Sequence, residues 1–119
     1  MASNPGVRAA EFKLETEKNP SEATVRVIGR ITSATSAELV NTIRELVPDR
    51  KRVVLDLTNV DHIDSSGLGA LVTLHVHATK ANCEIELVNQ KPRIRDLFRT
   101  VKLDTIFAGH DELLGMTPD

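Results

Sequence analysis

The chain has no tryptophan and no tyrosine, and only three of its 119 residues are phenylalanine. Proteins that bind single-stranded nucleic acid stack the bases on aromatic side chains, and many small-molecule pockets are lined by aromatic groups. Both kinds of site are therefore disfavoured. The composition favours a chain whose ligands are other proteins.

Cysteine and long apolar runs are also scarce. The single cysteine, Cys83, excludes an intrachain disulfide and fits a reducing compartment, where we expect a buried, unreactive thiol. No stretch approaches the ~20 apolar residues that span a bilayer, and residues 1–10 lack the apolar core of a signal peptide. We therefore expect a cytoplasmic protein without direct membrane insertion.

Neither sign of charge dominates. The 15 basic and 17 acidic residues give a formal net charge of -2, and no long run of lysine or arginine occurs, so a nucleic-acid partner is not expected. A basic cluster does occur between positions 91 and 102. We expect it to be a solvated helix face, and the alternative is a contact for an acidic partner; its members are Lys91, Arg93, Arg95, Arg99 and Lys102.

The first half of the chain predicts two strands and a helix. Residues 11–17 alternate between apolar and charged side chains, as an edge strand does, and residues 23–29 form a second strand after a turn at Asn19-Pro20-Ser21. We expect the two strands to pair as an antiparallel hairpin. Thr35 and Glu38 match a capping box ahead of an apolar helical repeat over 39–47, which Pro48 closes.

The second half alternates strands and helices. We expect a buried strand at 53–57, a helix from Asp64 or Ser65 to about Lys80, a strand around 84–87 and a helix from Pro92. Residues 106–107 suggest a last short strand, and 109–114 a terminal helical turn. This order predicts an α/β fold, a mixed sheet with helices packed against it. The expected organisation is a flexible tail at 1–10, one domain at 11–115 and a C-terminal tail at 116–119.

The segment that carries chemistry lies where the strand at 53–57 gives way to the following helix. It places Ser65 and Ser66 beside the unpaired N–H groups and the positive dipole end of that helix, where a phosphate is stabilised. Gly67 and Gly69 each cost about 1 kcal/mol relative to alanine in a helix, which suggests that another surface comes very close. The alternative is that Asp64 and Ser65 cap the helix and the glycines ease its packing on the sheet.

The run Ile63-Asp64-Ser65-Ser66-Gly67-Leu68-Gly69 resembles the STAS-domain anti-sigma-factor antagonists, and the resemblance extends over most of the chain. It implies that Ser65 is phosphorylated by a partner anti-sigma factor with serine kinase activity of the GHKL type. The unphosphorylated protein would bind that partner and free the sigma factor, and the phosphorylated form would not. The partner-binding residues implied are Asp64, Ser66, Gly67, Leu68, Arg30 and Thr32.

One departure from the family concerns the loop after the second strand, which often carries acidic residues beside the phosphorylated serine. This chain has Gly29-Arg30-Ile31-Thr32 there. Arg30 either weakens recognition by the usual kinase or pairs with the phosphoserine. At the neighbouring helix start, we expect a bulky residue in place of Gly67 to damage partner binding more than stability.

Catalytic, cofactor and metal sites are not expected. No Gly-x-Ser-x-Gly nucleophile elbow exists, and His75 and His77, two apart on a helix, point in different directions. No phosphate-binding loop is present, so ATP would belong to the partner and the chain would not be an enzyme. The alternative function is a non-switching STAS scaffold or an accessory subunit of a transport or stress-sensing assembly. The sequence leaves a homo-oligomer open.

Overall fold

The computed structural model describes residues 11–107, and this part of the chain forms one sheet with helices against it. Its elements are β1 (Lys13–Lys18), β2 (Glu22–Ile31), α2 (Ser36–Leu46), β3 (Arg52–Ile63), α3 (Ser65–Lys80), β4 (Glu84–Val88), α4 (Pro92–Thr100) and α5 (Asp104–Phe107). The tail expected at 1–10 and the helical turn expected at 109–114 lie outside the described residues.

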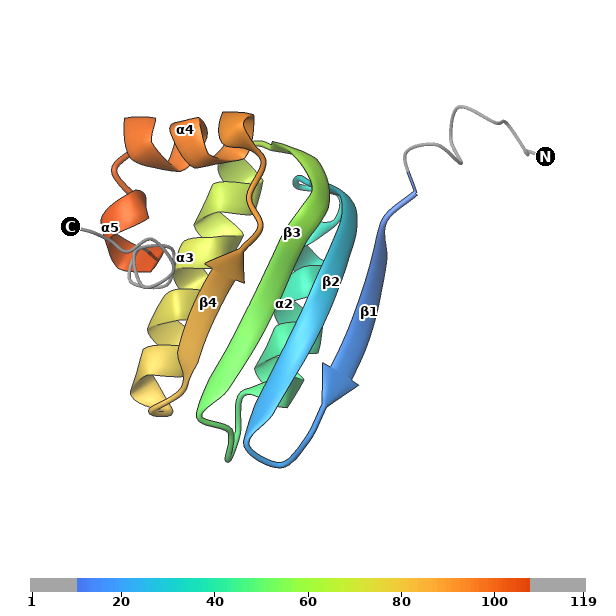
Figure 1. Cartoon of the computed structure of the whole chain (residues 1–119), viewed down its shortest axis with the longest axis vertical. Helices are drawn as coiled ribbons and strands as arrows, with labels where there is room; N and C mark the ends of the chain where they lie inside the picture. Colours follow the sequence, from blue (N-terminus) through green and yellow to red (C-terminus); the bar gives the residue numbers. More distant parts are fainter. Residues whose placement is uncertain (1–10, 108–119) are drawn as a thin grey trace.

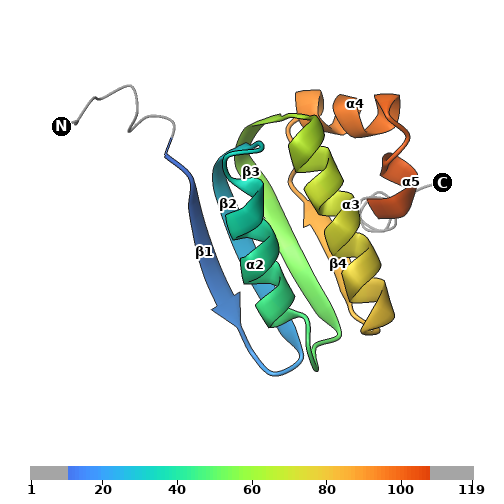
Figure 2. The same cartoon turned by 180° about the vertical axis from the view of Figure 1, so that it is seen from behind.

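The four strands lie in the order β1-β2-β3-β4 (Figure 1). The β1–β2 hairpin is antiparallel, as expected from its short turn, whereas β2–β3 and β3–β4 are parallel pairs. The connections between the parallel strands run through α2 and α3, which lie side by side across one face of the sheet (Figure 2). The mixed α/β sheet predicted from the sequence is thus confirmed.

The core lies between the sheet and these two helices. Alternate residues of the strands point into it, as Ala23, Val25 and Val27 of β2 do, and all three are buried. The helices contribute residues three or four apart, for example Leu71 and Leu74 of α3, which have no exposed surface. This packing holds α3 firmly on the sheet and so fixes the position of its first turn.

The opposite face of the sheet is not covered by any described helix (Figure 1), and it carries many charged side chains. Arg52 in β3 lies 3.9 Å from Glu22 of β2 and 3.8 and 3.1 Å from Glu84 and Glu86 of β4. These ion pairs cross three neighbouring strands. Partly exposed pairs of this kind contribute little to stability, but they suit a solvated surface.

Strand β3 is longer than the predicted 53–57, and it contains two irregularities. Its pairing with β2 passes from Arg26↔Asp56 to Ile28↔Asn59, and later from Gly29↔Val60 to Arg30↔His62, so β3 carries one extra residue each time. Its inward-facing residues Leu57, Val60 and Ile63 are accordingly three apart rather than two. The regular alternation of buried and exposed residues is lost there, so the sequence pattern predicts the strand only as far as residue 57. Strand β2 likewise runs on beyond Gly29, to Ile31.

The capping box expected at Thr35 and Glu38 is wrong. Helix α2 begins at Ser36, but the Thr35 side chain makes no capping bond. Its hydroxyl instead donates to the carbonyl of Arg30 at 2.7 Å and accepts from the N–H of Thr32 at 3.0 Å. Thr35 therefore closes the loop after β2, a use of the side chain that the spacing alone does not reveal.

The last strand, expected at Ile106–Phe107, is also wrong, because these residues belong to helix α5. The N–H groups of Ile106 and Phe107 both donate to the carbonyl of Leu103. Phe107 is buried, with its ring centroid 6.2 Å from that of Phe98 and 5.6 Å from that of His75. Two apolar residues in a row fit a buried helical turn as well as a strand.

Candidate functional site

The first turn of α3 has a defined cap. Asp64 is the N-cap residue, and its Oδ1 accepts a hydrogen bond of 2.9 Å from the N–H of Gly67. The Asp64 carbonyl accepts from the N–H of Leu68, also at 2.9 Å. The predicted helix, from Asp64 or Ser65 to Lys80, is confirmed, and one of its orphan N–H groups is satisfied by a carboxylate.

Ser65 and Ser66 are the first two residues of α3, and both are exposed. Within residues 11–107, neither hydroxyl makes a hydrogen bond to a protein group. The remaining N–H groups of the first turn and the positive end of the helix dipole lie beside them. An anionic group on either oxygen would therefore be electrostatically tolerated.

Gly67 is buried rather than open to a partner. A Cβ at this position would lie 2.9 Å from the carbonyl carbon of Ile31 and would overlap the carbonyl oxygen. The same oxygen accepts a hydrogen bond of 3.1 Å from the N–H of Asp64, so α3 begins in direct contact with the end of β2. The expectation that α3 would tolerate a larger residue at 67 is thus corrected. The sequence does not predict this contact, because no local pattern links Ile31 to a helix more than 30 residues away.

Gly69 behaves differently from Gly67. It is exposed, and a Cβ there would meet nothing within 4 Å. No contact among residues 11–107 accounts for a glycine in this turn, although it costs about 1 kcal/mol relative to alanine. Open space for a close approach from outside thus exists at Gly69 and not at Gly67.

The sheet brings Arg30 and Thr32 to the same edge as Asp64. β2 and β3 are parallel, and the pair Arg30↔His62 lies just before the last pair, Ile31↔Ile63. Arg30 is exposed and forms no ion pair within the described residues. Thr32 is half-buried, and its hydroxyl accepts from the N–H of Ala34 at 3.2 Å. Arg30 thus offers a charge at this edge, and Thr32 shapes the loop.

Leu68, another of the expected partner-binding residues, is only partly exposed. It packs against the hydrophobic core beneath the first turn of α3. Its buried part supports the turn on which the serines lie. The residues predicted for the site are therefore close together, but Gly67 and Leu68 contribute mainly to the fold.

Asp56, in the middle of β3, is held by hydrogen bonds from its neighbours. Asp56 accepts hydrogen bonds from the hydroxyl and the N–H of Thr58, at 2.6 and 3.0 Å, and from the side chain of Asn89 at 3.2 Å. Burial acts to raise the pKa of Asp56, but these hydrogen bonds and the nearby Arg26 outweigh it and lower that pKa. Asp56 is thus an ionised structural group at the first irregularity of β3.

The basic residues predicted around α4 are all exposed, as a solvated face requires; they are Lys91, Arg93, Arg95, Arg99 and Lys102. Arg99 pairs with Asp96 on the same helix at 3.0 Å. The buried side of α4 is formed by Ile94 and Phe98, four residues apart. A contact between this face and an acidic partner stays a prediction.

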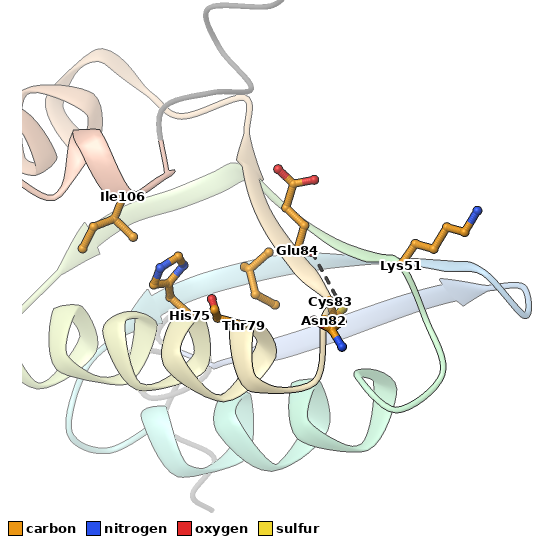
Figure 3. A pocket seen from close by; sticks show the side chains of 8 residues that line it. Lys51, His75, Thr79, Asn82, Cys83, Glu84 and Ile106 are labelled. Carbon is orange, nitrogen blue, oxygen red and sulfur yellow. Dashed lines mark hydrogen bonds between the residues drawn. The ribbon is translucent and has the colours of Figure 1, made fainter.

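A hollow of about 470 Å³ lies beside the C-terminal half of α3 and the start of β4 (Figure 3). It is lined by Lys51, His75, Thr79, Asn82, Cys83, Glu84, Ile85 and Ile106. Although a histidine and a cysteine share this hollow, residues 11–107 contain no group of three or more His, Cys, Asp or Glu that could hold a metal ion. Helices long and apolar enough to cross a membrane are likewise absent from that range.

Cys83 should be almost inert towards thiol reagents in the folded protein. It is buried, and burial, reinforced by Glu84 and opposed by Arg50, raises the pKa of the thiol. Because the thiolate is the reactive form, both effects slow alkylation. We expect iodoacetamide, followed by mass spectrometry, to label Cys83 in denaturant and to leave it largely unlabelled in native protein at pH 8. Rapid native labelling would contradict a buried thiol.

The chain is similar to known proteins along most of its length. A curated STAS-domain containing protein of Pseudomonas aeruginosa is 29% identical over 86 residues, which cover 72% of this chain and 85% of the relative. The crystal structure of an anti-sigma factor antagonist from Mycobacterium paratuberculosis superimposes with a TM-score of 0.72 at 25% identity. That match covers 83% of this chain and 85% of the other.

The same fold occurs in a protein of another kind. The murine Solute Carrier 26 family member A9 anion transporter matches with a TM-score of 0.71 at 13% identity, over 87% of this chain but 20% of the transporter. At that identity the likeness concerns the fold alone. The STAS domain family model matches residues 13–114, and the chain therefore belongs to the STAS domain family.

Proposed function

We propose that this protein is an anti-sigma-factor antagonist that is switched by phosphorylation of Ser65. The unphosphorylated form binds an anti-sigma factor with GHKL-type serine kinase activity and so releases a sigma factor for transcription. The kinase supplies ATP and transfers its phosphoryl group to Ser65, and the phosphorylated antagonist then dissociates. Family membership and the likeness to the mycobacterial anti-sigma factor antagonist support this assignment.

The observation that carries the proposal is the state of the Ser65 hydroxyl. It is exposed at the first position of α3, with no hydrogen-bond partner among the described residues. A kinase can reach it without unfolding the chain, and a phosphate there meets the positive end of the helix. The adjacent Asp64 carboxylate is engaged by the N–H of Gly67, which leaves the other N–H groups of the turn available.

The direct test is to incubate the protein with the partner kinase and ATP and to locate the phosphate by mass spectrometry. We expect one phosphate, on Ser65, which is lost in Ser65→Ala and retained in Ser66→Ala. Phosphate on Ser66, or on any other residue, would contradict the proposal.

A second candidate is a STAS subunit that holds an assembly together without switching. The fold alone does not separate the two candidates, since it also occurs within an anion transporter. A stable complex with the kinase that incorporates no phosphate, and that ATP does not dissociate, would favour this second candidate.

A further inference from the structure

The outward face of α3 is unusual for a helix that covers a sheet. Val76 is 46% exposed, and Val72, one turn before it, is half-buried. Helices that lie on a sheet normally expose polar residues on the outer face, and β-branched valine is not a good helix former. Two valines four residues apart on this face are therefore not explained by the folding of the domain alone.

These valines line a groove between α2 and α3, the two helices that face the viewer in Figure 2. The groove has a volume of about 380 Å³ and is lined by Arg44, Val72, Thr73, Val76, His77 and Lys80. Three of these six residues are basic and none is acidic. Within residues 11–107, neither Arg44 nor Lys80 forms an ion pair, so their charges are available to a ligand.

The groove continues the surface that begins at Ser65. At about 100° per residue, Ser65, Gly69, Val72 and Val76 all lie within a narrow band along α3. Gly69, with open space where its Cβ would be, lies between the serine and the valines on this band. A partner segment laid along α3 would therefore contact the switch residue at one end and the groove at the other.

We propose that this groove, formed by Arg44 of α2 with Val72, Val76 and Lys80 of α3, binds an acidic amphipathic helix of the anti-sigma factor. Apolar side chains of that helix pack on the valines, and carboxylates on its flanks pair with Arg44 and Lys80. The identity of the partner rests on the proposed function. The chemistry of the ligand rests on the groove alone.

The first test uses a short synthetic helix that carries leucines four residues apart, flanked by glutamates, and follows amide chemical shifts by NMR. We expect shifts concentrated at Val72, Val76 and Lys80. Replacing every glutamate of the peptide with lysine should abolish them. Equal shifts with the lysine peptide, or larger shifts at these residues with vesicles of anionic phospholipid, would overturn the proposal.

Matched variants of the protein make the test specific. Val76→Asp should weaken binding of the glutamate peptide by about tenfold, which corresponds to ~1.4 kcal/mol. Val101→Asp is the control, because Val101 is similarly exposed, at 41%, but lies outside the groove. We expect it to change binding by less than about twofold. Thermal melting should find both variants folded, and equal losses of binding in the two would contradict a specific groove.

A comparison with the intact partner kinase separates this proposal from the proposed function. Ser65→Glu should leave the peptide affinity unchanged, since the groove begins two turns beyond Ser65, but it should weaken kinase binding. If Val76→Asp weakens peptide binding but leaves kinase binding unchanged, the groove serves another partner and the assignment of its ligand fails. If Ser65→Glu binds the kinase normally while Val76→Asp does not, the phosphorylation switch fails and the groove stands.

Discussion

Replacing Gly67 with alanine should lower the stability of the folded protein by about 3 kcal/mol, at the upper end of what overpacking a core costs. The added methyl group would overlap the carbonyl oxygen of Ile31, and a backbone group cannot rotate away as a side chain can. Relief requires α3 to move off β2, which would also strain the hydrogen bond from the N–H of Asp64 to the same oxygen. For a domain of this size, we expect the melting temperature to fall by roughly 15 °C.

Gly69→Ala is the matched control for this prediction. It makes the same chemical change two residues along the same helix, but in open space. Because alanine is the better helix former, Gly69→Ala should be neutral or stabilise the protein by up to about 1 kcal/mol. Only the melting curve of Gly67→Ala should therefore shift to lower temperature. Similar curves for both would mean that α3 is not seated on Ile31.

Substitutions at Ser65 should separate binding from stability. Ser65→Ala should bind the partner of the unphosphorylated form with an affinity within about twofold of wild type, because the substitution keeps the site neutral. Ser65→Glu should weaken that binding on the order of 100-fold, since a charge buried against a surface that accepts a hydroxyl costs several kcal/mol. Both variants should melt close to wild type, because the residue is exposed and a negative charge at the helix start is favourable by about 0.3–1 kcal/mol.

Ser66 provides the neighbouring control. It is also exposed, but it lies about 100° further around α3. Ser66→Glu should therefore weaken partner binding less than Ser65→Glu, as measured by isothermal titration calorimetry. Wild-type affinity of Ser65→Glu would count against a switch at this position.

Arg30 lies at the same edge of the sheet, and its role there is still a prediction. Its backbone pairs with His62 at the end of β2, next to the strand that leads to Asp64. If the Arg30 guanidinium pairs with a phosphate on Ser65, phosphorylated Arg30→Ala should lose its phosphate at a different rate from the phosphorylated wild type.

The order of strands and helices followed directly from the sequence where the apolar pattern was regular. Helix α3 is an example, because Asp64 is a favoured cap residue and apolar residues recur along the segment that follows it. The pattern failed in β3, where two extra residues spaced the buried side chains Leu57, Val60 and Ile63 three apart. A spacing of three suits neither a regular strand nor a full helix, so the sequence pattern predicts the strand only as far as residue 57.

The candidate site was only partly predictable for a different reason. The places of Asp64 as the cap and Ser65 as the first helical residue were predictable because both depend on the local sequence at the helix start. The role of Ser65 as a switch stays a prediction. The role of Gly67 depends on Ile31, and that of the α3 valines on Arg44 of another helix. Such contacts exist only once the elements have packed, and a single sequence does not encode them in any local pattern.

The carbonyl of Ile31 limits how far a structural change at Ser65 can extend through the molecule. It accepts a hydrogen bond from the N–H of Asp64 and lies where Gly67 lacks a side chain, and both contacts hold the start of α3 against β2. We therefore expect a phosphate on Ser65 to leave the position of α3 unchanged. The effect of the phosphate should thus stay local to the surface around Ser65. The ion-paired face around Arg52 lies on the other side of the sheet from α3, and we expect its amide chemical shifts to be the same with and without a phosphate on Ser65.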